Sequence, residues 1–499
     1  MTQQGARTSD LSDWVNPVAV KEFRQAVQSR WVVAVLLLFL LLNLAVVGGY
    51  LLLSPDIATD TEAGQGVFAV LLGILMFICF TFVPAYTGLR LSLERHSTDI
   101  DLFFVTTITP GAIVRGKYLT AMALTLLIFS VCMPFMVLTY LLRGIDLPTI
   151  FTILAACFLL CAAANALGLF AGAVSGGWII RGLVAAGIGL FLFYMAVAMV
   201  PGIHAFLLLG SGNLLDFSPT TWAWIGTLLL LETLGVGLLY ILAVALLTPR
   251  SANRMMPPRL YLTGCWAVSG CLAGLWSYSE EDLDPLVGWL VLSTMALSVM
   301  LVAALGERDT WSPRVRRAIP RNRLARMATF LLYTGSAGGM LWYSMLLGAS
   351  VLVVVAWGNA APWYSGASDL FEVIPNSLMG FGYILCYCLT IAAVRPLLFP
   401  RVPTPHLSVF AMVLGVAMCL VPYLIAFFVD RDYWSTLPWY MLGSPLVLTE
   451  NNSPLREAAM HSLSVWLAVS GLGSIPWLVG QVRQFVPYEL KPESEAVAA

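Results

Sequence analysis

One carboxylate lies deep inside an apolar run of this sequence. Glu232 stands in Leu-Leu-Leu-Leu-Glu232-Thr-Leu-Gly, in a stretch that otherwise lacks charge. A charged side chain is costly in lipid, so such a group faces the interior of a helix bundle or a water-filled cavity. Its candidate roles are a protonatable site, a polar contact with a substrate, or a protonated packing residue, and the sequence leaves all three open.

A second stretch is close to a phosphate-binding motif. The residues from Gly111 to Tyr118 match G-x-x-x-x-G-K but end in Tyr118, where the motif has Ser or Thr to ligate Mg²⁺. They also lead straight into an apolar run, whereas a phosphate-binding loop follows a buried strand. The sequence carries no HExxH site and no nucleophile elbow either. We therefore expect no ATPase site, no bound cofactor and no enzymatic activity in this chain.

The nine cysteines predict neither a metal site nor a disulfide framework. All of them lie in apolar runs, where cysteine behaves as a small hydrophobic residue. Cys157 and Cys161 share a helix face, and Cys386 and Cys388 are two residues apart. Neither pair has the third and fourth ligands that a metal ion needs.

The chain that holds these residues is mostly apolar. Of its 499 residues 59% are hydrophobic and 11% are charged, and the mean hydropathy is +0.86, whereas soluble domains carry about 25% charged residues. A helix needs roughly 20 apolar residues to cross a bilayer, because lipid offers no partner for an unpaired backbone group. The sequence predicts an all-α polytopic membrane protein with about twelve transmembrane helices, at 31–53, 66–88, 119–141, 150–174, 180–201, 223–248, 260–278, 286–305, 331–356, 376–394, 407–429 and 462–480.

Lysine and arginine are distributed unevenly among the predicted loops. With a cytoplasmic N-terminus, only Arg143, Arg431 and Arg456 of the 26 basic residues lie outside, and basic residues favour the cytoplasmic side. We expect cytoplasmic N- and C-termini and a multi-pass protein of the cell inner membrane. The first thirty residues lack the apolar core of a secretory signal, so we expect no cleavage there. The net charge of −1 gives no indication of nucleic acid as a partner.

Two segments outside the predicted spans are amphipathic. Asn16-Pro17 is typical of a helix start, and the helix that follows would lie in the headgroup layer with its basic face toward anionic lipid; the alternative is an ordinary basic flank. The connection 90–118 contains a break at Thr109-Pro110 between two short helical patterns. We expect a protruding pair of helices that docks on a cytosolic partner, the alternative being a solvated loop.

Six predicted spans fall on each side of residue 250, which divides the chain into modules 1–250 and 251–499. Loop lengths correspond between them, with a long inner connection after each second span (89–118 and 306–330) and a long outer one after each fifth (202–222 and 430–461). Parallel repeats of this kind are common in transporters. We therefore consider the second module a divergent repeat, although only Glu94-Arg95 recurs, as Glu307-Arg308. Segment 202–222 is apolar enough to form a re-entrant or interfacial helix.

Two motifs of the first module resemble those of the ABC-2 type permeases, the membrane subunits of bacterial ATP-binding cassette exporters. Residues 16–30 (N-P-V-A-V-K-E-F-R-Q-A-V-Q-S-R) are similar to the family's connecting helix, N-P-x-x-x-K-E-x-R, and supply Lys21, Glu22 and Arg24. Residues 94–117 (E-R-H-S-T-D-I-D-L-F-F-V-T-T-I-T-P-G-A-I-V-R-G-K) are similar without a gap to its coupling segment, E-R-x-x-G-T-L-E-L-L-L-x-T-P-L-S-P-x-x-I-x-x-G-K. Thr98-Asp99 replaces Gly-Thr and Thr107 replaces Pro.

The resemblance, which covers residues 14–250, implies a permease that a separate ABC-type ATPase drives, with ATP and Mg bound by that partner. The implied ATPase-coupling contacts are Glu94, Asp101, Leu102, Thr106, Pro110 and Lys117. If the second module is a permease lobe, one chain and two ATPase subunits complete the transporter. If it is an accessory bundle, two chains form a homodimer.

Two other functions fit a polytopic chain. One is a proton-coupled secondary transporter of twelve spans with Glu232 as the relay, although intramembrane charge is nearly absent and the second span is not followed by a G-x-x-x-D-R-x-G-R loop. The other is a non-transporting membrane scaffold of an envelope complex. The substrate does not follow from the sequence, because export cavities are lined by the same apolar residues that pack helices.

Overall fold

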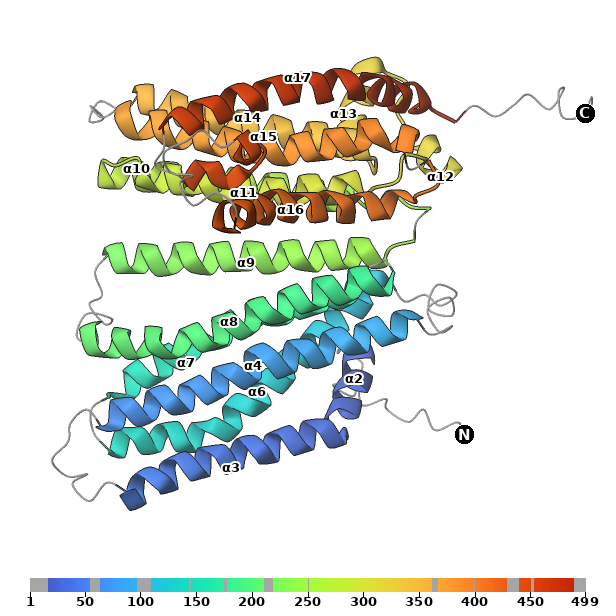
Figure 1. Cartoon of the computed structure of the whole chain (residues 1–499). Helices are drawn as coiled ribbons and strands as arrows, with labels where there is room; N and C mark the ends of the chain where they lie inside the picture. The colour runs from blue at the N-terminus through green and yellow to red at the C-terminus, as the bar shows by residue number, and fades with distance from the viewer. Residues whose placement is uncertain are drawn as a thin grey trace, which may run out of the picture. The chain divides into compact units, whose positions relative to one another are not determined.

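The computed structural model describes most of the chain, and every regular element in the described residues is helical. The chain divides into two compact units, Met1–Thr248 and Pro249–Ala499, next to the predicted boundary at residue 250. Figure 1 shows that within each unit the long helices run side by side. The described residues are 17–53, 63–96, 109–142, 145–174, 177–210, 219–249, 251–360, 367–398, 400–428, 439–449 and 453–488.

The first unit places α4 at the centre of its long helices. Helix α4 packs on α3, α6, α7 and α8, and α7 packs on α9. The short α2 packs mainly on α6. The helices are α2 (Pro17–Val27), α3 (Arg30–Leu53), α4 (Ala63–His96), α6 (Pro110–Leu141), α7 (Leu147–Ala173), α8 (Trp178–Gly210) and α9 (Pro219–Leu247).

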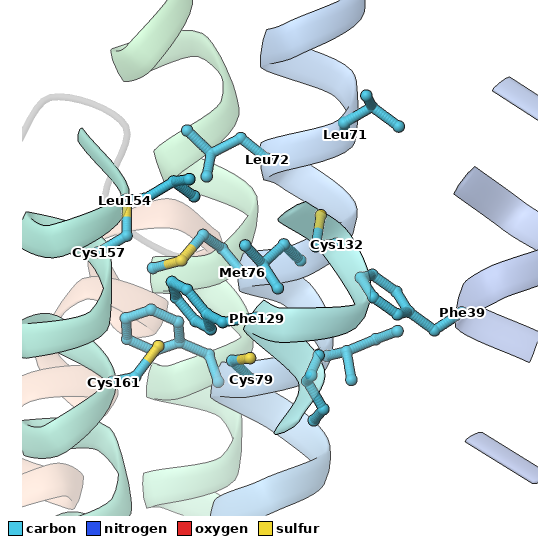
Figure 2. Close-up of a cluster of buried hydrophobic side chains, with 14 of the residues drawn as sticks. Phe39, Leu71, Leu72, Met76, Cys79, Phe129, Cys132, Leu154, Cys157 and Cys161 are labelled. Atoms are coloured by element: carbon cyan, nitrogen blue, oxygen red, sulfur yellow. The ribbon is translucent and has the colours of Figure 1, made fainter. Parts of the chain in front are cut away.

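The core of this unit is apolar and includes four cysteines. Figure 2 shows Phe39 of α3 close to Cys132 of α6, and Met76 and Cys79 of α4 facing Phe129, Cys157 and Cys161. All nine cysteines lie in described residues and none forms a disulfide. The buried cysteines act as small packing residues here, as predicted.

Helices α4 and α7 approach each other closely at three glycines. A side-chain carbon added to Gly168 would lie 2.6 Å from both Cβ and the carbonyl oxygen of Pro84, and one added to Gly172 would collide with the backbone of Gly88. Small residues allow this backbone approach between membrane helices. The spacing of Gly168 and Gly172 therefore serves helix packing.

The second unit places α11 in a similar central position. Helix α11 packs on α10, α14, α15 and α16, and α15 also packs on α16 and α17. The elements are α10 (Met256–Glu280), α11 (Asp284–Leu305), α12 (Pro313–Arg317), α13 (Arg323–Leu332), α14 (Ser336–Ala360), α15 (Ala367–Leu398), η1 (Thr404–His406), α16 (Leu407–Phe428), η2 (Trp439–Met441), η3 (Pro445–Thr449) and α17 (Ser453–Gln484).

The described residues contain eleven helices that are long and apolar enough to cross a membrane. These support a multi-pass membrane protein. The seventh predicted span, 260–278, is helical as part of α10 but is not one of the eleven, because its several Gly, Ser, Trp and Tyr residues lower its mean hydropathy. Residues 202–210, predicted to begin a separate outer segment, instead continue α8 beyond Pro201, and residues 211–218 lie outside the described part.

Candidate functional site

The helix predicted to start at Asn16-Pro17 is present as α2. Its buried residues are Ala19, Glu22 and Ala26, which recur at helical spacing on the side that packs on α6. Contact with α6 is close at Gly116, where an added side-chain carbon would lie 2.9 Å from Val18 Cβ. Thr120 Oγ1 of α6 also donates a hydrogen bond to the Ala19 carbonyl oxygen over 3.3 Å.

Glu22 enters an ion cluster that joins three helices. Lys117 Nζ of α6 lies 3.1 Å from Glu22 Oε1 of α2 and 2.8 Å from Glu94 Oε2 of α4. Arg90 Nη1 lies 3.7 Å from Glu22 Oε2, and its guanidinium lies 5.5 Å from the centre of the Tyr86 ring. We call Glu22, Arg90, Glu94 and Lys117 the Lys117 cluster. It brings together residues that are 95 positions apart in the sequence (22 to 117).

The side chains of the Lys117 cluster differ in how far they are buried. The side chains of Lys117 and Glu22 are 3% and 6% exposed, whereas that of Glu94 is 35% exposed. Two carboxylates and two cations balance each other, which is required because an unpaired buried charge costs several kcal/mol. The cluster therefore fixes α2 and the ends of α4 and α6 to one another. Lys117 is held by two carboxylates and is not the free lysine of a phosphate-binding loop.

Helix α6, which follows segment 97–108, begins with a side-chain cap. Thr109 Oγ1 accepts a hydrogen bond from the Ala112 amide over 3.3 Å, and Pro110 occupies the first turn of α6. The Tyr240 hydroxyl of α9 donates a hydrogen bond to the Gly111 carbonyl oxygen over 3.2 Å. Three predicted contact residues between these two ends, Asp101, Leu102 and Thr106, lie outside the described residues.

The other two predicted residues of the connecting helix lie on its outer face. Lys21 and Arg24 are exposed, and with Pro17, Val20, Gln25 and Gln28 they line an open hollow of about 470 Å³. Their cationic ends are therefore available to a ligand or partner, unlike Lys117. Sequence reasoning treated Lys21, Glu22 and Arg24 as one group, and the structure separates the inward carboxylate from the two outward cations.

Glu232 lies on α9, apart from the Lys117 cluster. Glu232 as a whole is partly exposed. Its Oε1 atom, however, is buried and has no hydrogen-bond partner among the described residues. It lies close enough to Tyr118 of α6 to interact with it electrostatically, and the Tyr118 hydroxyl donates to the Ala162 carbonyl oxygen of α7 over 3.4 Å. Glu232 is thus a carboxyl of a candidate membrane span, near a hydrogen bond that joins α6 and α7.

The second unit contains a buried ion pair that sequence reasoning missed. Arg259 Nη2 of α10 lies 2.7 and 2.6 Å from the two carboxylate oxygens of Glu307, and the side chains are 0% and 5% exposed. Arg259 also donates to the carbonyl oxygens of Leu331, Tyr333 and Gly335. We call this the Arg259 cluster. The recurrence of Glu94-Arg95 as Glu307-Arg308 was the one available signal for it.

The Glu307 carboxylate binds the start of α14 in addition to binding Arg259. The Gly335 amide donates to Glu307 Oε2 over 2.8 Å, directly before α14 begins. Burial raises the pKa of the Glu307 carboxyl, and the Arg259 guanidinium opposes this rise. Nearby, Asp309 accepts a hydrogen bond from Ser336 and lies 3.4 Å from Arg395 of α15. Three helices of this unit are therefore tied together at one end.

Among the described residues no three His, Cys, Asp or Glu side chains are grouped so that they could hold a metal ion. Cys157 and Cys161 instead lie within the apolar core.

No family model, no curated protein and no solved structure matches this chain.

Proposed function

We propose that this chain is the membrane-spanning permease subunit of an ATP-binding cassette exporter, driven by a separate ATPase subunit that binds ATP and Mg. The observation that carries this proposal is the Lys117 cluster. Glu22 belongs to one ABC-2-like motif, and Glu94 and Lys117 belong to the other. These two motifs, which have no reason to meet in a generic apolar bundle, supply three of the four members of one buried cluster.

The Lys117 cluster is suited to transmitting a movement of a bound partner to the membrane helices. Segment 97–108 is bounded on one side by the end of α4 and on the other by the Thr109 cap of α6. Lys117 links these two helices through Glu94 and links both to α2 through Glu22. A force on the segment would therefore move α2, α4 and α6 together. Such rigid-body movement of packed helices underlies alternating access.

The proposed roles of the coupling residues follow from their burial. Lys117 anchors the cluster from within, and Pro110 sets the first turn of α6. Direct contact with the ATPase is assigned to Glu94, which is partly exposed, and to Asp101, Leu102 and Thr106. Lys21 and Arg24 present two further cations on the outer face of α2.

The decisive experiment is purification of the tagged full chain from its host in mild detergent, followed by identification of co-purifying proteins and an ATPase assay. Glu94→Arg is a poor probe, because it would also break the contact with Lys117. Asp101→Lys changes a residue of the coupling segment instead, and reversing an interface charge typically costs several kcal/mol of affinity. Glu280→Lys, at an exposed position of the second unit, is the matched control.

We expect an ATPase to co-purify with the unmodified chain and with Glu280→Lys, and to be lost with Asp101→Lys. A chain that purifies alone and shows no ATP hydrolysis under any condition would contradict the proposal.

A second candidate function is proton-coupled transport through Glu232. The observation that favours it is the buried Oε1 atom of this intramembrane carboxyl, which has no hydrogen-bond partner in the described part of the chain. Glu232→Gln removes the proton site with little change in shape, and Thr233→Val, at the exposed neighbouring position, is its control. Loss of proton-driven substrate flux in proteoliposomes with Glu232→Gln alone would favour this candidate, whereas ATP-dependent flux that survives Glu232→Gln would exclude it.

A further inference from the structure

The connection between α11 and α14 forms a small folded element, although its basic composition alone indicated only a loop. Ser312 Oγ caps α12 by accepting from the Val315 amide over 3.3 Å, and Asn322 Oδ1 caps α13 by accepting from the Leu324 amide over 3.1 Å. Figure 1 shows both short helices at the end of the second unit where α17 ends. We call α12 and α13 together the basic element.

One side of the basic element is fixed by aromatic packing. Phe485, beyond α17, has its ring centre 5.0 Å from that of Trp311 and 5.4 Å from that of Phe330. Trp311 Nε1 donates to the Thr334 carbonyl oxygen over 2.6 Å, and the Tyr333 hydroxyl donates to the Ala318 carbonyl oxygen over 3.2 Å. The orientation of the opposite side is therefore set by the fold.

That opposite side is cationic and partly apolar. Residues 310–335 contain no Asp or Glu, and among the described residues the exposed arginines of this face have no ion-pair partner. Leu324 and Met327 are 76% and 68% exposed and lie three residues apart on α13. Residues at this spacing share one face of a helix. The exposed arginines of this face are Arg314, Arg321 and Arg323, whereas the Arg317 guanidinium lies 5.4 Å from the centre of the Tyr488 ring.

We propose that this face binds the anionic phospholipid headgroups of the bilayer that holds the chain, with Leu324 and Met327 inserted at the acyl boundary. Basic amphipathic helices bind membranes in this way, with cations toward anionic lipid and apolar side chains buried. The position supports this occupant, because α13 ends at Leu332 and α14, a candidate membrane span, begins at Ser336. So short a connection keeps the basic element near the membrane surface.

The test is hydrogen-deuterium exchange of the full chain in nanodiscs of phosphatidylcholine, with and without one third phosphatidylglycerol. We expect residues 313–332 to exchange more slowly in the anionic discs. Arg321→Gln/Arg323→Gln should weaken this lipid-dependent protection by about 25-fold, because each cation at an anionic surface contributes about fivefold in affinity. Arg401→Gln removes an exposed charge elsewhere in the same unit and should leave the protection unchanged.

Leu324→Gln/Met327→Gln tests the inserted side chains separately and should also reduce the protection, with the exchange of α14 to α17 as the check on folding. Equal exchange in both kinds of disc would overturn the proposal. So would an equal loss of protection in the Arg401→Gln control, which would indicate general charge attraction. Protection that appears only when a soluble protein is added would show that this face docks a protein instead of lipid.

Discussion

Lys117 and Arg259 are long cationic side chains that are buried near the ends of long helices, α6 and α10. Water cannot solvate them there, so each depends on carboxylates and backbone carbonyls within its unit. Lys117 is shared between Glu22 and Glu94, whereas Arg259 binds both oxygens of Glu307 and three carbonyl oxygens. The planar guanidinium suits the second arrangement because its donors form a fixed fork.

Replacing Lys117 should destabilise the first unit strongly. Lys117→Met leaves the buried Glu22 carboxylate with Arg90 as its remaining cation, at the longer distance of 3.7 Å, and removing one partner of a buried pair typically costs about 3–5 kcal/mol. Lys21→Met removes the same charge from an exposed position and should change stability by less than about 0.5 kcal/mol. Denaturant unfolding of the purified chain in detergent measures both. Equal effects of the two substitutions would show that the Lys117 cluster does not hold the helices together.

Arg259 and Glu307 should show strong coupling in a double-mutant cycle. Arg259→Met leaves the Glu307 carboxylate buried and three carbonyl oxygens without a donor, so we expect a loss of about 3–5 kcal/mol. In Arg259→Met/Glu307→Gln no charge remains buried, and the loss should be smaller than the sum of the single changes by about 1–3 kcal/mol. Unfolding of the three variants beside the unmodified chain gives this coupling energy. Simple additivity would mean that the two side chains act independently.

The sequence predicted which residues belong to the candidate site better than it predicted the contacts between them. Glu22, Glu94 and Lys117 were chosen from motif resemblance, but periodicity cannot show that a lysine 23 positions after Glu94 closes onto both carboxylates. That closure depends on how α2 crosses α6. The sequence does not single out Arg259, because a cation beside Pro257-Pro258 is also typical of an ordinary basic flank of a membrane span.

Most of the long helices could be predicted at the scale of elements, because apolar runs of membrane length leave the backbone no alternative to internal hydrogen bonds. The basic element α12 and α13 could not. Its caps, Ser312 and Asn322, are visible in the sequence, but its stability depends on Phe485, more than 150 residues away. Composition alone makes such a segment look like a solvated loop.

The close approach of α4 and α7 gives a prediction with a matched control. Gly172→Ala would drive a methyl group into the Gly88 backbone, and overpacking of this kind costs about 1–3 kcal/mol. Gly182→Ala, in α8, meets no atom within 4 Å and should be neutral or slightly stabilising. Thermal unfolding in detergent compares the two. A neutral Gly172→Ala would show that α4 and α7 separate easily.

The two units share an order of helix neighbours. In each, the second long helix is central: α4 packs on α3, α6, α7 and α8, and α11 packs on α10, α14, α15 and α16. In each unit the fourth long helix packs on the fifth and the sixth. Helix α7 packs on α8 and α9 in the first unit, and α15 packs on α16 and α17 in the second. Glu94 and Glu307 lie at corresponding helix ends. The match is incomplete, because α6 packs firmly on α7 while the contact between α14 and α15 is weak or missing.

This shared order is what a divergent repeat predicts, and it bears on the number of subunits in the proposed transporter. If both units are permease lobes, one 54.2 kDa chain should bind two ATPase subunits; if only the first is a lobe, two chains should be present. Native mass spectrometry of the complex purified in detergent distinguishes these masses directly. We expect a single chain, because each unit has its own buried ion cluster at the end of its second long helix, and under the proposed function each cluster would couple the connection that follows this helix to the bundle. A complex with two chains would show that the second unit, despite its similar helix order, has an accessory role.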